Sequence, residues 1–123
     1  MVEAARVVLT VPADASFVRL ARLAAADAGS RAGLTLEEID DLRIAVGELC
    51  VQVMGPGDAT TSLTFAISPG LVEIDGVGPP ALETDFTEIS KSIVAAVADA
   101  HEVSTNGQTR QFHLTKQSVP ARA

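Results

Sequence analysis

A carboxylate and an amide in an apolar segment are the first candidates for chemistry in this sequence. Glu48 and Gln52 lie four residues apart, a spacing that places two side chains on one face of a helix. Ile44, Ala45 and Val51 surround them, and a carboxylate in apolar surroundings can act as a general base. The alternative is an exposed Glu–Gln pair on the solvated side of a helix, and without further context the pattern favours this alternative.

A second candidate is the segment Asp-Gly-Val-Gly at residues 75–78, which ends a predicted strand and precedes two prolines. Glycines allow a backbone to approach a ligand closely, and Asp75 can accept a hydrogen bond from that ligand. An ordinary glycine–proline turn would use the same residues. Other reactive residues give weaker signals: His101 and His113 belong to no cluster with metal-ligand spacing, and Cys50 fits a buried structural thiol.

The composition is that of one acidic domain. The 123 residues are 47% apolar, and we expect one domain over residues 1–117 followed by a frayed tail at residues 118–123. With four Phe, no Tyr or Trp and a net charge of −7, the chain is poorly suited to bind nucleic acid. One cysteine and the lack of a long apolar run favour a cytoplasmic protein without a signal peptide or a membrane span.

Alternating hydrophobicity and turn residues predict five strands. They are expected at residues 6–11, 62–67 and 71–75 and on both sides of a hairpin turn at Asn106-Gly107. With the helices, the predicted order is strand, helix, helix, two strands, helix, two strands. Because hairpins dominate, we expect a mixed, mostly antiparallel sheet with three helices on one face, which is a two-layer α/β (α+β) sandwich. This architecture alone indicates no function.

Capping residues and apolar stripes predict the three helices. The clearest begins with the capping box of Thr35 and Glu38, and the others begin near Asp14 or Ser16 and near residues 85–88. The residues expected to face the core are Phe17, Leu20, Ala21, Ala24 and Ala28 in the first helix, Leu36, Ile39, Leu42, Val46, Leu49, Cys50 and Val53 in the second, and Ile89, Ile93, Ala96, Val97 and Ala100 in the third.

Two segments resemble one bacterial family. Residues 11–20 (VPADASFVRL) and 34–50 (LTLEEIDDLRIAVGELC) are similar to the anti-sigma factor serine kinases, small members of the histidine-kinase-like (GHKL) ATPase superfamily that regulate sporulation and stress sigma factors. The similarity extends over nearly the whole chain, to residues 113–116, and is most specific between residues 39 and 50. The resemblance implies the histidine-kinase-like ATPase fold, which is the α/β sandwich expected above.

The resemblance gives Glu48 and Gln52 specific roles. Glu48 matches the glutamate that serves the family as a general base. Gln52 stands where the family has an asparagine that holds Mg²⁺ between the protein and the ATP phosphates. Magnesium demands short contacts in near-octahedral geometry, and the extra methylene of glutamine displaces the amide oxygen. We therefore expect the metal-binding role of Gln52 to be impaired.

The family motif Asp-x-Gly-x-Gly is also altered. Its aspartate recognises the adenine amino group. Aligning Gly76 and Gly78 with the two glycines places Ile74 at the aspartate position, whereas aligning Asp75 with the aspartate displaces both glycines by one residue. Only half of this motif is therefore preserved in either alignment.

The third family feature is a flexible, glycine-rich lid over the triphosphate. Here the span 79–88 is short, no glycine occurs between Gly78 and Gly107, and Glu88 stands near the position of the lid glycines, where it would repel phosphate. ATP and Mg²⁺ are the cofactors that the resemblance implies. The three departures predict weak or absent ATP binding and no efficient kinase activity.

The resemblance also implies protein partners. In the family, an arginine that follows a Ser-Phe-x segment on the first helix contacts the sigma factor and the antagonist protein. Arg19 occupies this position and Arg22 lies one turn further on the same face, although both also fit solvated helix arginines. We expect a regulator that binds a sigma factor or an anti-sigma antagonist, without direct contact to nucleic acid or membrane, and family members are commonly dimers.

Two other hypotheses remain open. The chain can be a divergent but active ATP-dependent serine kinase in which Glu48, Gln52 and Asp75 suffice. It can also be a small-molecule sensor that uses the former nucleotide cleft, with more apolar residues such as Ile74 lining it.

Overall fold

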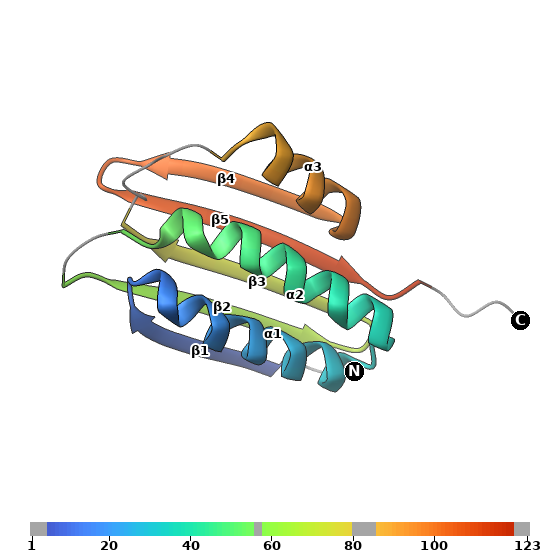
Figure 1. Cartoon of the computed structure of the whole chain (residues 1–123). Helices are drawn as coiled ribbons and strands as arrows, with labels where there is room; N and C mark the ends of the chain where they lie inside the picture. Colours follow the sequence, from blue (N-terminus) through green and yellow to red (C-terminus); the bar gives the residue numbers. More distant parts are fainter. Residues whose placement is uncertain (1–4, 56–57, 80–85, 120–123) are drawn as a thin grey trace, which may run out of the picture.

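The computed structural model describes residues 5–55, 58–79 and 86–119. Five strands form one sheet in the order β1-β2-β3-β5-β4, and each neighbouring pair is antiparallel. Helices α1 and α2 lie side by side on one face of the sheet, and α3 lies beside β4 (Figure 1). The elements are β1 Ala5–Pro12, α1 Val18–Ala32, α2 Leu36–Cys50, β2 Thr60–Ser68, β3 Leu71–Gly78, α3 Glu88–Val97, β4 Ala100–Asn106 and β5 Thr109–Gln117, with 3₁₀ turns at Ala15–Phe17 and Val51–Val53. The predicted element order and the two-layer sandwich are confirmed.

Alternation along the strands places the core between the sheet and the helices. Successive strand residues point to opposite faces, and β2 buries Leu63, Phe65 and Ile67, as predicted. The intervening residues of β2 are small or hydroxyl-bearing and lie on the face without helices. The helices close the core with mostly small side chains from α1 and larger ones from α2: Ala21, Ala25, Ala28, Ala32, Leu42, Ala45, Val46, Leu49 and Cys50.

The capping box at the start of α2 is confirmed, but the predicted stripes are wrong at two leucines. Thr35 Oγ1 accepts a hydrogen bond from the Glu38 amide at 3.1 Å, and Glu38 Oε1 accepts one from the Thr35 amide at 2.8 Å. Leu36 is 83% exposed and Leu20 is 43% exposed. At roughly 100° per residue, each lies a quarter to a third of a turn away from the buried face of its helix.

The third helix is shorter than its apolar stripe predicted. It begins at Glu88, where Thr87 Oγ1 accepts from the Ser90 amide at 3.1 Å, and it ends at Val97. Ala100 belongs to β4, and Val94 is the buried residue of the helix, whereas Ile89 is 74% exposed. The prediction failed because the backbone becomes extended after Val97, so that β4 can pair with β5.

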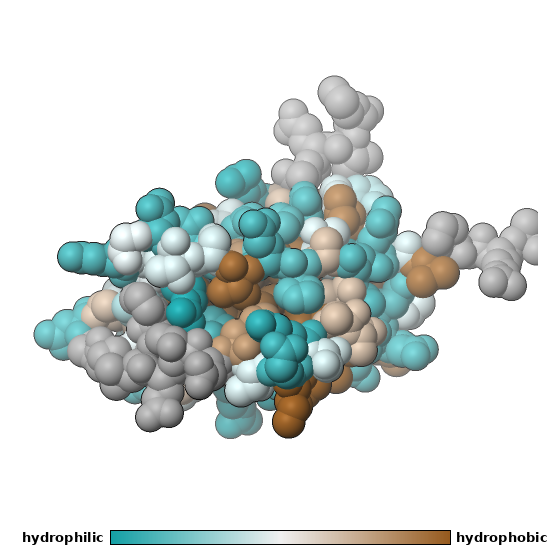
Figure 2. All heavy atoms as spheres, turned by 90° about the horizontal axis from the view of Figure 1, so that it is seen from above, coloured by the Kyte–Doolittle hydropathy of each residue, from teal (hydrophilic) through white to brown (hydrophobic). Residues whose placement is uncertain are grey.

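An apolar face of α3 is consequently open. Ile89, Ile93 and Ala96, together with Glu88 and Ser92, line a shallow groove of about 430 Å³. Figure 2 views the molecule from the side of α3 and β4 and shows hydrophobic atoms, in brown, interrupting a mostly hydrophilic surface. This is the largest difference between the predicted and the observed core.

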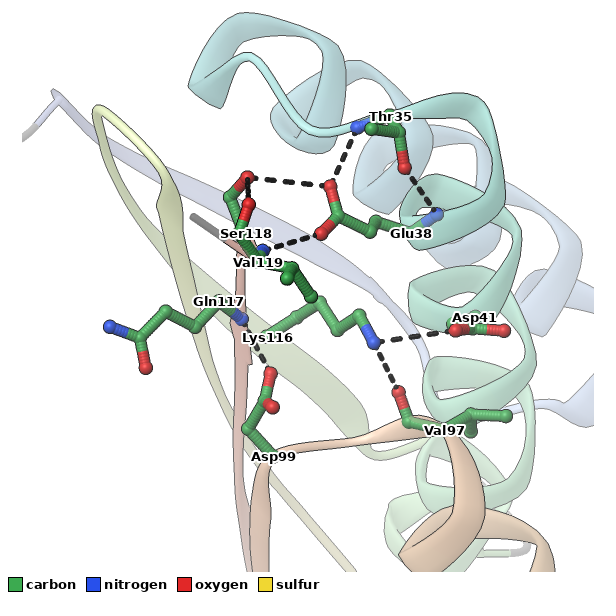
Figure 3. Close-up of polar contacts among 9 residues, drawn as sticks. All are labelled: Thr35, Glu38, Asp41, Val97, Asp99, Lys116, Gln117, Ser118 and Val119. Atoms are coloured by element: carbon green, nitrogen blue, oxygen red, sulfur yellow. Dashed lines mark hydrogen bonds and ion pairs between the residues drawn. The ribbon is translucent and has the colours of Figure 1, made fainter. Parts of the chain in front are cut away.

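Polar contacts of residues near the start of α2 fix the end of β5 and the residues that follow it (Figure 3). Glu38 Oε2 accepts from the Val119 amide at 2.8 Å, and Lys116 Nζ donates to the Val97 carbonyl at 2.9 Å and lies 3.3 Å from Asp41 Oδ2. The Ser118 amide donates to the Gly70 carbonyl at 2.8 Å. Residues 118 and 119, the first two of the predicted frayed tail, are therefore hydrogen-bonded to the domain, and residues 120–123 lie outside the described part.

Candidate functional site

Glu48 and Gln52 face different neighbours, although the sequence predicted one shared helix face. Helix α2 ends at Cys50, so Gln52 lies in the 3₁₀ turn that follows it. A 3₁₀ turn has three residues per turn instead of 3.6, which rotates Gln52 away from the position that a continued α-helix would give it. Glu48 is half-buried in a hollow between α1 and α2 with Arg22 and Arg43, whereas the Gln52 amide contacts β5.

The surroundings of Gln52 do not fit a magnesium ion. Its side chain is buried, with 5% of the residue exposed, and its Oε1 accepts a hydrogen bond from Arg110 Nη1 at 3.0 Å. The oxygen that would ligate the metal is thus bound to a permanent cation. Among residues 5–55, 58–79 and 86–119, no group of three or more His, Cys, Asp or Glu residues is arranged to hold a metal ion.

Packing within the domain accounts for the two glycines of residues 75–78. Both lie inside β3, not in the turn that the sequence also allowed, and both are buried on the helix-covered face. A Cβ atom at Gly76 would overlap the ring of Phe112, and one at Gly78 would overlap the Val53 carbonyl and approach Thr61 Oγ1 to 2.6 Å. These contacts require glycine whether or not a ligand binds.

The sheet separates Asp75 from Gln52 and the two glycines. Because side chains alternate along β3, Ile74 is buried on the helix-covered face and Asp75 is exposed on the opposite face. Asp75 Oδ1 lies 2.8 Å from His113 Nδ1, within hydrogen-bond distance. The alignment that places Ile74 at the aspartate position of the family motif is thus the one in which all three motif positions share a face.

The remaining sequence predictions for this region concern the lid and the reactive side chains. Residues 80–85 lie outside the described part, so the short lid at residues 79–88 stays a prediction. Cys50 is completely buried, and burial raises the pKa of its thiol to about 12, which fits the structural role predicted for it. His101 and His113 lie in β4 and β5.

Arginines from α1 and α2 line a groove on the helical surface. The groove measures about 450 Å³ and contains both partner-binding candidates, Arg19 and Arg22. The hollow that holds Glu48 adjoins it, because both are lined by Val18, Arg22 and Arg43. We call this surface the arginine groove and define it by Ala15, Ser16, Val18, Arg19, Arg22, Leu23 and Arg43.

The arginines of the groove make few ion pairs within the described part of the chain. Arg19 and Arg22 are exposed, and no carboxylate in the described part of the chain lies within ion-pair distance of either. Arg43 has Asp40 at 3.5 Å, but its Nε atom is buried and has no hydrogen-bond partner among the described residues. Three of the nine basic residues thus converge in a chain whose net charge is −7.

Sequence reasoning missed Arg43, which comes from the other helix of the groove. No spacing within α1 or α2 indicates it. Gly47, one turn further along α2, gives no clear signal either, because a Cβ atom there would lie 3.4 Å from Arg22 Cδ, which is an ordinary contact distance.

Comparisons with known proteins agree with this architecture. The family model described as histidine kinase-like ATPase domain matches residues 11–120. The serine-protein kinase RsbW of Halalkalibacterium halodurans is 35% identical over 69 residues, which are 54% of this chain and 43% of that protein. The match therefore spans less than half the length of this relative. None of the helices in the described part of the chain is long and apolar enough to cross a membrane.

Proposed function

Because the chain belongs to the histidine kinase-like ATPase domain family, we propose that it is a regulator that binds a sigma factor or an anti-sigma antagonist through the arginine groove, without efficient turnover of ATP. The observation that carries this proposal is the convergence of Arg19, Arg22 and Arg43 from two helices. The similarity to a serine-protein kinase named RsbW supports the class of partner.

The chemistry of the groove fits an acidic segment of a protein partner. Guanidinium groups bind carboxylates through paired, charge-assisted hydrogen bonds, and Arg19 and Arg22 are exposed and have no ion pair in the described part of the chain. Leu23 is 56% exposed at the groove and offers apolar area beside the charges. Arginine is enriched at protein-binding surfaces, so the arginines carry this argument more than Leu23 does.

Three features of the structure support the proposed lack of efficient ATP turnover. Glu48 and Gln52 face different neighbours, Arg110 donates to the Gln52 oxygen, and Ile74 stands at the position of the adenine-binding aspartate. Each of them removes one part of the nucleotide site that the family resemblance implies. ATP and Mg²⁺ therefore do not enter the proposed function as cofactors.

An active, divergent serine kinase is the second candidate function. The name of the relative, a serine-protein kinase, and the retained Glu48 favour it. The sensor hypothesis receives less support, because Ile74 is completely buried. A cytoplasmic location and a homodimer both stay predictions.

The first experiment measures partner binding. The purified chain is titrated by biolayer interferometry against the sigma factors and anti-sigma antagonists of its own organism. We expect one of them to bind, and Arg22→Glu to weaken the complex by roughly tenfold or more, since reversing one charge of an interface pair costs at least about 1.4 kcal/mol. Arg31→Glu is the matched control on α1, because Arg31 pairs with Asp27 and does not line the groove. Equal losses in both variants would exclude the groove as the interface.

The second experiment separates the regulator from the kinase. Isothermal titration with ATP and ADP, each with Mg²⁺, should give no heat of binding up to millimolar nucleotide. A dissociation constant in the micromolar range, accompanied by phosphate transfer to the bound antagonist, would instead establish the kinase and refute the proposed lack of turnover.

A further inference from the structure

The side chain of Gln52 contacts a cation of the same chain, the guanidinium group of Arg110. Arg110 is the second residue of β5, where it pairs with Gly78 of β3 on one side and with Thr105 of β4 on the other. Gly78 has no side chain to obstruct the strand surface at this point. The arginine reaches the 3₁₀ turn after α2 and donates from Nη1 to Gln52 Oε1 at 3.0 Å.

Neutral groups fix the position of this guanidinium. Besides Gln52, its partner is Thr105 Oγ1, to which Nε donates at 3.3 Å. Within the described ranges, no carboxylate lies within 4.0 Å of Arg110. A guanidinium stays charged at any physiological pH, so its positive charge lies permanently against the Gln52 oxygen and is not cancelled by a nearby acid.

A divalent cation at the same oxygen would meet two obstacles. It would have to displace or share a hydrogen bond that a 5%-exposed amide already makes, and it would lie a few ångströms from another cation. Like charges at that separation repel strongly in a partly buried setting. The extra methylene that makes glutamine a poor replacement for asparagine as a metal ligand extends the amide instead toward β5.

We propose that Arg110 is the resident cation of this position and keeps divalent metal away from Gln52. The residue therefore controls the access of divalent metal to this amide, a role that neither the family nor the relative assigns to it. The inference concerns the end of α2 and the start of β5, and it does not depend on a partner at the arginine groove.

The test uses Mn²⁺ with ATP as a paramagnetic substitute for Mg²⁺. In the ¹⁵N-labelled chain, Mn²⁺ bound at Gln52 would broaden the signals of its side-chain amide. We expect these signals to broaden no more than those of Gln117, an exposed glutamine at the opposite end of β5 on the face without helices, which reports random encounters. Selective broadening of Gln52 in the unmodified chain would overturn the proposal.

Two substitutions identify the charge as the cause. Arg110→Met keeps the length of the side chain and removes its charge and donors, so that Mn²⁺–ATP should broaden the Gln52 signals several-fold more than in the unmodified chain. Arg110→Lys keeps a charge and should protect Gln52. If the two variants, both shown to be folded by their spectra, respond alike, the cation does not control metal access and the proposal fails.

Discussion

Glu38→Gln tests whether one carboxylate stabilises the domain through its charge. Glu38 is 7% exposed and accepts hydrogen bonds from the amides of Thr35 and Val119, both at 2.8 Å (Figure 3). A glutamine of the same shape has one acceptor oxygen, so its NH₂ group must face one of these two donors. The substitution removes one charge-assisted bond and weakens the other, with an expected loss of about 2 kcal/mol in the free energy of unfolding.

The assay is thermal and chemical unfolding, with Glu37→Gln as the control. For a domain of this size, about 2 kcal/mol corresponds to a fall of ~8 °C in Tm. Glu37 is exposed in the same first turn of α2, so Glu37→Gln removes the same charge from the same helix end without breaking a contact to β5. Its expected cost is about 0.5 kcal/mol, the value of a carboxylate near a helix start.

The pH dependence gives a second readout of the same contact. The amides of Thr35 and Val119 hold the pKa of Glu38 below its usual value of 4.5. A carboxyl with a lowered pKa in the folded state stabilises above its unfolded pKa, and this contribution is lost as the pH falls through the folded pKa. The difference between the unmodified chain and Glu38→Gln should therefore be complete at pH 7 and shrink below about pH 4. A difference that is constant with pH, or an equal loss in Glu37→Gln, would refute the reasoning.

Three further predictions concern the core. Gly76→Ala should destabilise the domain by roughly 2 kcal/mol or more, because the new methyl group overlaps the ring of Phe112. Urea unfolding measures this loss. Leu36→Ala should change the unfolding free energy by less than about 0.5 kcal/mol, whereas Leu42→Ala, at a fully buried site, should cost about 2–5 kcal/mol in the same measurement. Cys50 should resist alkylation by iodoacetamide at pH 8 until the chain is unfolded, because its thiol is buried with a pKa of about 12; rapid labelling of the folded chain would contradict this.

The fold was predictable because most of its signals are local. The capping box of Thr35 and Glu38 involves residues three apart, and the alternation of Leu63 with its neighbours in β2 appears in the sequence directly. The end of α3 was not predictable in the same way. Helical periodicity continues to Ala100, but the pairing of β4 with a strand that follows it determines where the helix stops. Tertiary pairing of this kind overrides a local pattern.

The candidate site was predictable only for residues that share one helix. Arg19 and Arg22 lie three residues apart, so their common face follows from the sequence. Arg43 joins them through the packing of α1 on α2, which no spacing within either helix reveals. The same limit applies to Gln52, because its partner Arg110 is 58 residues away in the chain. The 3₁₀ turn that orients the Gln52 amide toward β5 cannot be recognised in the hydrophobic pattern of the sequence.

Gln52, Gly76 and Gly78, which match positions of the family's nucleotide site, are part of the packed interior here, and this bears on which kind of ligand the domain can bind. A nucleotide at Gln52 would have to separate a buried amide from Arg110, and an unpaired buried amide costs about 1–3 kcal/mol before any new contact forms. It would also have to enter beside Ile74, which is completely buried. A partner at Arg19 and Arg22 breaks no internal bond of those side chains in the described structure, since both are exposed and unpaired there. Protein binding therefore does not require the loss of an internal hydrogen bond, whereas nucleotide binding at Gln52 does. This difference in free energy is the physical basis for proposing a regulator rather than a kinase.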